Sequence, residues 1–292
     1  MRELVFLGTD ELTQSELRFI RDDGDDKIRL DTEFVCLSTH RALLSSVAFA
    51  GHLHDTSRPV HVLVLGLGAG VLPSYLIYNF SHVHVTCLEL DPVVYDLAKE
   101  YFDLPFDSER LTVVIDDALK YVQSLADSKK QLFDIILCDI DGKENTHVVE
   151  APPAPFRTPE FLDMLKSLLK ASNKVATEKA KEKLLPSCLA INYVCEEPEK
   201  QEFQACMRDL LDRFDHVSAL VLSPVHECNI ITYGVVGEGS LTAALSDLRK
   251  WEALSDLPYS TGLSQLVELT AHDIQSSGRL IPHRSGSKRM RT

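Results

Sequence analysis

The chain has 292 residues, of which 45% are hydrophobic and 25% are charged, a balance typical of a soluble globular protein with a sizeable core. Acidic residues outnumber basic ones by 44 to 30, and the formal net charge is −14, which argues against a surface that follows nucleic-acid phosphates. No apolar run is long enough to cross a bilayer, and the first residues lack the apolar stretch of a secretory signal. We therefore expect a cytoplasmic protein with neither a membrane nor a nucleic acid as its partner.

Cysteine usage and acidic clusters exclude two further classes of site. The seven cysteines are scattered and never spaced as Cys-x-x-Cys, so we expect neither a disulfide scaffold nor a zinc site. Residues 22–26 (DDGDD) lack the spacing and the terminal glutamate of a calcium loop. A solvated turn is the better interpretation, and no metal site is expected.

The first 55 residues are predicted to form a β-hairpin followed by a helix. Polar and apolar residues alternate over 4–7, 16–21 and 27–30, and the last two runs flank the acidic turn. From Arg41 onward the apolar residues recur at helical spacing.

Residues 56–276 are predicted to form one α/β domain with a mostly parallel sheet. Its apolar, β-branched strand runs lie at 60–65, 83–88, 111–115, 133–138 and 188–194. Helical patterns follow them at 69–80, 92–102, 118–126, 159–169 and 199–214. Strands that are apolar on both faces and alternate with helices indicate a parallel sheet covered on both sides. Residues 217–222 and 229–236 are expected to form a pair of strands that completes the sheet. The second of these is a candidate for an antiparallel strand.

The remaining segments are predicted from composition and spacing. Residues 241–254 and 263–274 have helical patterns, and Trp251 in the first of them is expected to pack in the core. Residues 170–183 are polar and rich in lysine, which fits a solvated helix extension or a mobile insert. Residues 277–292 are expected to be a disordered basic tail.

A glycine-rich turn joins the first buried strand to the next helix. Residues 62–73 read VLVLGLGAGVLP, so that Gly66, Gly68 and Gly70 form a G-x-G-x-G turn. Glycines let the backbone approach a ligand, and a helix N-terminus offers N–H groups and positive dipole to an anion. Val71 stands where a dinucleotide fingerprint needs its third glycine, which argues against an NAD-dependent oxidoreductase.

Acidic residues follow the next two strands. Glu89 ends the second strand, where a carboxylate can accept hydrogen bonds from a ribose diol, and Asp117 follows the third, within reach of an adenine amino group. A tight turn with helix-capping acids would explain each of these residues alone. Together, at the ends of successive strands, they predict an adenosine-containing ligand at the carboxyl edge of the sheet.

Two more carboxylates follow the fourth strand, in the segment CDIDGKE. Asp139 leaves the strand end, and Asp141 points the same way if the chain stays extended. Two carboxylates beside a nucleoside pocket can hold an amine nucleophile, although loop or capping acids are the simpler alternative. Their position at the strand end favours a functional role.

Several of these segments resemble one family of class I methyltransferases that use S-adenosylmethionine and share the spermidine-synthase-like fold. They are similar to the C-terminal domain of the methyltransferase-like protein 13 family, the lysine and N-terminal methyltransferases of translation elongation factor 1-alpha. The similar segments lie at 3–7, 14–16, 62–68, 138–143, 152–156 and 189–195. The resemblance extends over residues 1–275, and it implies a Rossmann-like, mostly parallel seven-stranded sheet preceded by an N-terminal hairpin.

The resemblance also implies an activity and a set of site residues. That family's lysine-methylating domain has no counterpart here, so the implied reaction is methylation of the N-terminal α-amine of elongation factor 1-alpha, with S-adenosylmethionine as cofactor and a protein as partner. Whether the chain also forms a homodimer stays open. As catalytic residues we expect Asp139 and Asp141, which would orient the amine through its N–H bonds, and Asn192, which would offer it a carbonyl. A plain polar residue at a strand end is the alternative for Asn192. The implied cofactor-binding residues are Gly66, Gly68, Gly70, Glu89, Leu90, Asp117, Ala118 and Asp139.

Three residues and two further functions remain as alternatives. His40 and Arg41 could reach the cofactor carboxylate, but a polar pair at a helix start is the favoured interpretation, and Phe156 is a candidate for the acceptor entrance. A polyamine aminopropyltransferase of the same fold would carry an acid in its glycine loop and a D-x-x-D motif, where this chain has Ala69 and Gly142. A non-catalytic interaction protein of this fold would keep the glycine turn but not depend on Asp139.

Overall fold

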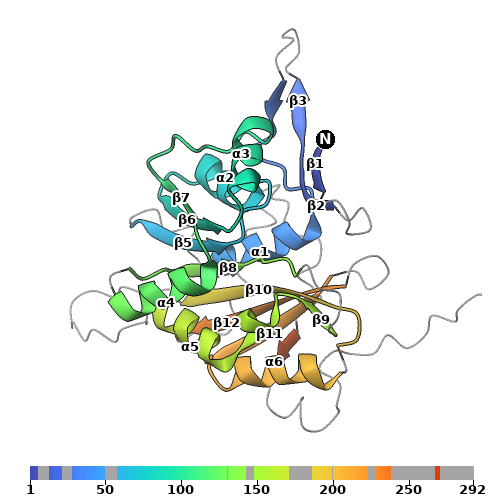
Figure 1. Ribbon diagram of the computed structural model, residues 1–292, viewed down its shortest axis with the longest axis vertical. Helices are drawn as coiled ribbons and strands as arrows, with labels where there is room; N and C mark the ends of the chain where they lie inside the picture. Colours follow the sequence, from blue (N-terminus) through green and yellow to red (C-terminus); the bar gives the residue numbers. More distant parts are fainter. Residues whose placement is uncertain are drawn as a thin grey trace, which may run out of the picture.

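A computed structural model describes the fold for most of the chain, and its core is one large sheet (Figure 1). The described residues are 1–5, 13–21, 28–49, 58–129, 131–142, 148–170, 186–198, 200–222, 228–237 and 267–269. Within them, no helix has the length and apolar character needed to span a membrane.

The middle of the sheet is parallel, as predicted. Its strands lie in the order β7-β6-β5-β8-β10, and each neighbouring pair is parallel. The five strands are β5 (Val60–Leu65), β6 (Val83–Glu89), β7 (Leu111–Ile115), β8 (Ile135–Cys138) and β10 (Ser187–Cys195). Because both faces are covered, β8 and most of β5 and β10 are buried along their length.

Antiparallel strands complete one side of the sheet. β12 (Asn229–Val236) lies between β10 and β11 (His216–Val221) and runs antiparallel to both, which confirms the predicted antiparallel strand. β9 (Val149–Ala151) pairs with the end of β10. The central seven strands therefore form the predicted class I methyltransferase sheet.

The prediction of a helix over residues 263–274 is wrong at its centre. β13 (Val267–Leu269) is a strand that pairs antiparallel with β11. The apolar spacing of this segment suits either structure, and the unpaired backbone groups along the edge of β11 favour the strand. The predicted helix 241–254 with Trp251, residues 171–183 of the predicted insert, and the tail 277–292 lie outside the described residues.

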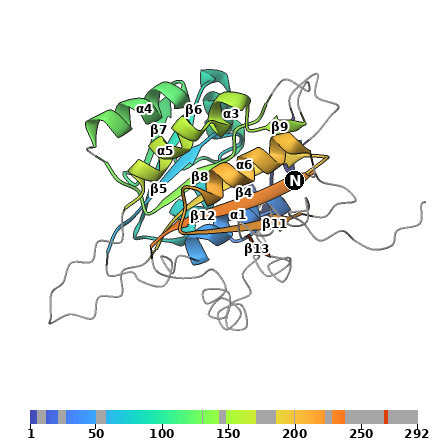
Figure 2. The same cartoon turned by 90° about the horizontal axis from the view of Figure 1, so that it is seen from below.

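Helices cover the two faces of the sheet (Figure 2). One face packs against α1 (Ser38–Phe49), α2 (Val71–Asn79) and α3 (Pro92–Tyr101). The other packs against α4 (Ala118–Ser128), α5 (Pro159–Leu168), which follows the short 3₁₀ helix η1 (Ala154–Arg157), and α6 (Gln201–Leu211). Three of these helices begin where a polar side chain can cap them, since Asp91, Asp117 and Thr158 each accept a bond from a backbone N–H of α3, α4 and α5.

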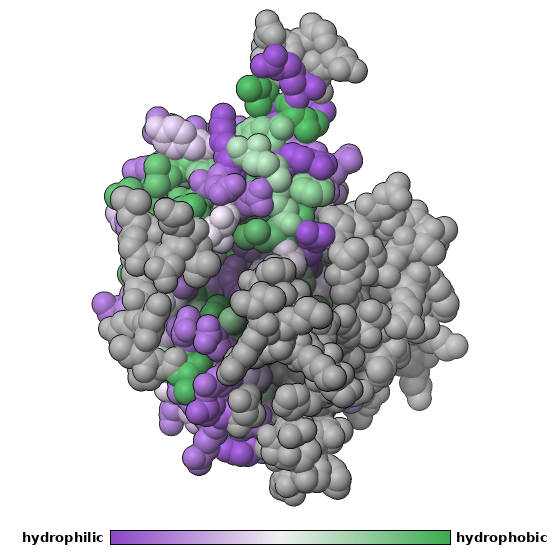
Figure 3. Space-filling view, turned by 90° about the vertical axis from the view of Figure 1, so that its right-hand side faces the viewer, coloured by the Kyte–Doolittle hydropathy of each residue, from purple (hydrophilic) through white to green (hydrophobic). Residues whose placement is uncertain are grey.

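The N-terminal segment forms two hairpins rather than one. β1 (Arg2–Val5) pairs with β2 (Thr13–Leu17), and β3 (Phe19–Arg21) pairs with β4 (Ile28–Leu30). Arg18 lies between β2 and β3, and its guanidinium binds Asp31 and lies over the ring of Phe34. Figure 3 shows hydrophobic residues among hydrophilic ones over these hairpins, at the top of the view.

At the opposite edge of the sheet from the strand ends with acidic residues, one buried carboxylate holds three segments together. Asp134 is 1% exposed and accepts hydrogen bonds from the His61 backbone N–H, the Arg58 guanidinium and the Lys170 ammonium. Lys170, the first residue of the predicted insert, is thus part of the framework. Its backbone N–H also donates to the carbonyl of Phe133.

We expect Asp134→Ala to lower the free energy of unfolding by about 3 kcal/mol or more, because it leaves a buried N–H and two cations without their acceptor. Urea unfolding measures this change. The matched control is Asp163→Ala, which removes a carboxylate that is 62% exposed and should cost less than about 1 kcal/mol. Equal effects of the two substitutions would contradict the account of Asp134.

Candidate active site

The predicted site residues meet at the carboxyl edge of the parallel strands. Cys138 of β8 pairs with Leu65 of β5 on one side and with Ile191 of β10 on the other. The next residue of each strand is therefore Gly66, Asp139 or Asn192, in one row and on one face of the sheet. Backbone hydrogen bonds continue the row, since Asp139 N–H donates to Leu65, Gly66 N–H to Leu88 and Asp116 N–H to Glu89.

Gly66 makes the close approach of β5 and β8 sterically feasible. It has a φ of +96°, and a Cβ atom there would lie 2.2 Å from the carbonyl oxygen of Asp139. Only glycine lacks that atom and adopts this conformation without strain. Gly70 has a φ of +78° and is the residue before α2, so the turn ends at the start of that helix as predicted.

Glu89 fastens the glycine turn to the beginning of α3. Its Oε2 accepts from the backbone N–H of Leu67 at 3.1 Å, and its Oε1 accepts from that of Asp91 at 2.9 Å. A carboxylate has about four acceptor positions, so capacity for ligand hydroxyls remains. Leu90 beside it is 72% exposed and Ile115 at the end of β7 is 40% exposed, which leaves apolar side chains at these strand ends.

Asp117 fulfils one of the two roles considered from the sequence, that of a helix cap. Its Oδ1 caps α4 by accepting from the Leu119 N–H at 2.9 Å, and Ala118 is the first residue of that helix. Its Oδ2 lies 3.9 Å from the Lys120 ammonium. The capping interpretation is therefore correct, and the adenine contact stays a prediction that the second oxygen could fulfil.

Asp139 is the centre of a polar network that reaches across the sheet. The Asn192 amide donates to its Oδ1 at 2.8 Å, and His40 Nε2 lies 3.4 Å from its Oδ2. Asn229 Nδ2 in turn donates to Asn192 Oδ1 at 2.9 Å. The Asp139 side chain is 22% exposed and that of His40 is 5% exposed. The carboxylate is therefore held by Asn192 and His40 and is still partly accessible from outside the protein.

The network keeps Asp139 in its charged form. Burial alone would raise the pKa of this carboxyl group, but the hydrogen bond and charge of His40 and the hydrogen bond from Asn192 outweigh burial. The pKa of Asp139 is therefore below its ordinary value. At neutral pH the site presents a carboxylate that can accept hydrogen bonds.

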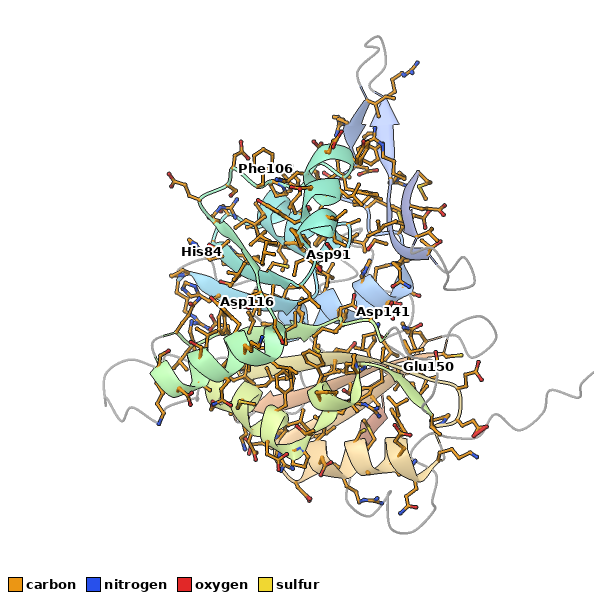
Figure 4. The ribbon with its side chains drawn as sticks, in the orientation of Figure 1. His84, Asp91, Phe106, Asp116, Asp141 and Glu150 are labelled. Carbon is orange, nitrogen blue, oxygen red and sulfur yellow. The ribbon has the colours of Figure 1, made fainter. Side chains whose placement is uncertain are left out.

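Asp141 lies in a different environment from Asp139. It is exposed, and Figure 4 shows it near Glu150 of β9. Burial, followed by the charges of Glu196 and Asp141, raises the pKa of Glu150. Asp141 thus belongs to an acidic rim with Glu150 and Glu196, and a direct hold on an acceptor by both aspartates stays a prediction.

Three residues of this site were assigned otherwise or missed by the sequence analysis. His40 lies in the first turn of α1 but contacts Asp139, so the interpretation of a plain helix-start pair is wrong for it; Arg41 does bind locally, to the Cys36 carbonyl. Asn229 carries no sequence pattern that indicates a site residue, other than its place at the start of a strand.

Ser15 also contributes to the site without having been predicted to do so. This residue of β2 accepts from the Ala69 N–H at 3.2 Å and so holds the glycine turn. Phe156 packs edge-on against Phe161, and its place at the acceptor entrance stays a prediction.

The parallel sheet with helices on both faces, a glycine turn after β5 and a carboxylate at the end of β6 define the class I, Rossmann-like methyltransferase fold. Among the described residues no cluster of three or more His, Cys, Asp or Glu side chains is suited to a metal ion. The sequence model of the spermine/spermidine synthase domain matches residues 40–204. The chain belongs to that family.

Two curated relatives are named as methyltransferases. The chain is 30% identical over 190 residues to the eEF1A lysine and N-terminal methyltransferase of Danio rerio, covering 58% of this chain and 27% of the relative. It is 36% identical over 118 residues to the N-terminal histidine N-methyltransferase of Emericella nidulans, covering 40% of this chain and 19% of the relative. The chain thus spans about a quarter or less of the length of these relatives.

Two structures share the fold over most of the chain. Human methyltransferase-like protein 13 in complex with SAH superposes with a TM-score of 0.60 at 25% identity, covering 73% of this chain and 89% of that one. A probable spermidine synthase from Corynebacterium glutamicum superposes with a TM-score of 0.58 at 16% identity, covering 94% of this chain and 95% of that one. The second similarity supports the fold alone.

We expect Gly66→Ala to be far more destabilising than Gly68→Ala. The methyl group at residue 66 meets a backbone oxygen at 2.2 Å, whereas at residue 68 it meets the Ser15 hydroxyl at 2.7 Å, which can rotate away. Thermal unfolding should show a loss of about 3 kcal/mol or more for Gly66→Ala and about 1 kcal/mol for Gly68→Ala. The reverse order would contradict the close approach of β5 and β8.

Proposed function

We propose that the chain transfers a methyl group from S-adenosylmethionine to the α-amine at the N-terminus of a protein, and specifically of translation elongation factor 1-alpha. The observation that carries this proposal is the Asp139–Asn192 pair, which lies next to the glycine turn on the same edge of the sheet. The names of the two relatives support the choice of acceptor, since each describes a methyltransferase acting at an N-terminus.

The residues at the strand ends suit the proposed cofactor. Gly66 leaves room for close backbone approach, and Glu89 and Asp117 keep acceptor capacity for ribose hydroxyls and an adenine amino group. Leu90 and Ile115 offer exposed apolar surface for the faces of a planar base. When bound, S-adenosylmethionine supplies an electrophilic methyl group on its sulfonium.

The protein's own contribution would be placement of a neutral amine. An N-terminal α-amine has a pKa of about 7.7–8.0, so roughly a fifth of it is already neutral near pH 7.2. Asp139, charged and held by its neighbours, would accept an N–H of the amine, and Asn192 Oδ1 retains a second lone pair for another. Holding the amine in line with the methyl group is then the main source of acceleration.

One steric detail argues against the aminopropyltransferase alternative. The second acid of a D-x-x-D motif would fall on Gly142, where a Cβ atom would lie 1.9 Å from the carbonyl oxygen of Glu150. No side chain fits there unless β9 moves. The family match to the spermine/spermidine synthase domain therefore supports the fold and the cofactor class rather than a polyamine substrate.

The central test offers methyl-labelled S-adenosylmethionine and purified elongation factor 1-alpha with a free or an acetylated N-terminus. We expect label on the free α-amine only, located by mass spectrometry. Asp139→Ala should lower kcat by about 100-fold, because the amine loses its acceptor, while cofactor affinity changes little. Asp163→Ala, which removes an exposed carboxylate of α5 that pairs with Arg213, serves as the matched control.

The other possible results of this test contradict different parts of the proposal. Cofactor binding without label on elongation factor 1-alpha would contradict the acceptor and direct the search to other amines, beginning with putrescine and decarboxylated cofactor. Absence of cofactor binding would contradict the enzymatic proposal and favour an interaction protein. Equal loss of turnover and cofactor affinity in Asp139→Ala would contradict its assignment to the amine.

The pH profile gives an independent test. Because the pKa of Asp139 is below its ordinary value, its carboxylate stays charged above pH 5 and should not produce an activity limb near neutrality. The rate should instead follow the neutral fraction of the acceptor. We expect kcat/KM to rise about tenfold per pH unit between pH 6 and 7 and to level off above about pH 8. A limb centred near pH 5 would contradict this account.

A further inference from the structure

Asn229 is connected to the proposed acceptor site through one intermediate side chain. It is the first residue of β12, and its Nδ2 donates to Asn192 Oδ1 at 2.9 Å. In the antiparallel pairing of β10 with β12, Asn192 lies opposite Ile231 and Asn229 lies opposite Val194. Residues two apart on a strand share a face, so the two asparagines are diagonal neighbours on the face that carries Asp139.

The direction of the hydrogen bonds depends on how the Asn192 amide is turned. A carboxamide has a donor end and an acceptor end of nearly equal size, whereas a carboxylate only accepts. Asn192 must therefore present its NH2 group to Asp139, as it does at 2.8 Å. If the amide turned over, its oxygen would face the carboxylate and the charge-assisted hydrogen bond would be lost.

Asn229 stabilises the productive orientation. Asn192 is 8% exposed, so its side-chain oxygen has little access to water. The N–H donor of Asn229 provides that oxygen with a hydrogen bond. The donors thus run in one direction, from Asn229 to Asn192 to Asp139. Hydrogen bonds that run in one direction polarise and strengthen one another.

We propose that Asn229 is a positioning residue, which acts through Asn192 to fix the orientation in which the Asp139 carboxylate receives the acceptor amine. This proposal rests on the proposed function, because it assigns a role within the same site. In the hydrogen-bond network described above, Asn229 bonds to Asn192, and Asn192 in turn bonds to Asp139. The effect of Asn229 should therefore appear in turnover and not in cofactor affinity.

Asn229→Asp is the decisive substitution, because it keeps the shape of the side chain but replaces the donor by an acceptor. Two carboxylates would then compete for the single NH2 group of Asn192. We expect kcat to fall at least tenfold, with the dissociation constant of S-adenosylmethionine changed less than twofold. Asn229→Gln retains a donor and should recover at least part of the lost kcat, which a purely structural role would not predict.

Cys228→Asp is the matched control for the added negative charge. Cys228 is the exposed neighbour of Asn229, and none of the hydrogen bonds that hold Asp139 involves its side chain. We expect this variant to keep its kcat within twofold. An equal loss in Cys228→Asp and Asn229→Asp would show that charge alone is responsible and would overturn the proposal.

A double substitution tests whether Asn229 acts through Asn192. In an Asn192→Ala background the intermediate side chain is gone, so adding Asn229→Asp should lower kcat by less than twofold further. A further loss of tenfold would overturn the proposed route. A departure from additivity of this kind is the standard measure of coupling between two residues.

A readout without turnover separates this proposal from the proposed function. In the protein without substrate, the side-chain amide signals of Asn192 in a ¹⁵N-correlated NMR spectrum should shift in Asn229→Asp and stay in place in Cys228→Asp. Shifted signals in a chain that methylates no N-terminus would support the positioning role and contradict the proposed function alone. Unshifted signals would overturn the role of Asn229 whatever the activity.

Discussion

The contact between the end of β5 and the end of β8 is the constraint on which the rest of the site depends. Gly66 passes so near the Asp139 carbonyl that a single added carbon would lie 2.2 Å from its oxygen. The bond from Asp139 N–H to Leu65 continues the ladder at this point. Because the strands stay paired to their last residues, the side chains that follow them form one row, and the glycine turn lies directly beside the carboxylate.

Electrostatics adds a second requirement, which is a charged carboxylate in a mostly enclosed position. Burial opposes that charge, and the polar neighbours of Asp139 on α1 and β10 reverse the balance and lower its pKa. At the rim, the pKa of Glu150 is raised instead, since its neighbours Glu196 and Asp141 are also acidic. The inner carboxylate is therefore held by hydrogen-bond donors, whereas burial and the charges of the outer acids raise the pKa of Glu150.

Several side chains contribute to folding and to the proposed chemistry at once. Glu89 ties the glycine turn to α3, and Asp117 caps α4, yet each keeps acceptor positions for a ligand. Ser15, in the N-terminal hairpins, also holds the glycine turn, because its hydroxyl accepts from the Ala69 N–H. A substitution at any of these residues should therefore lower stability, whereas Asn229 offers a way to change the site from a neighbouring strand.

The sequence by itself determined the parallel sheet, its antiparallel strand and the residues at the strand ends, because strand and helix periodicity and the acids that follow each strand are local properties. It also marked Gly66, Glu89, Asp117, Asp139 and Asn192 as site candidates. Only the tertiary structure decided that His40 contacts Asp139 and that Asn229 contacts Asn192. It also decided that Gly142 lies against the backbone of Glu150 and that residues 267–269 are a strand. Those contacts depend on how β12 registers on β10, how α1 packs on the sheet and which edge remains unpaired, and no local pattern of residues encodes these relations.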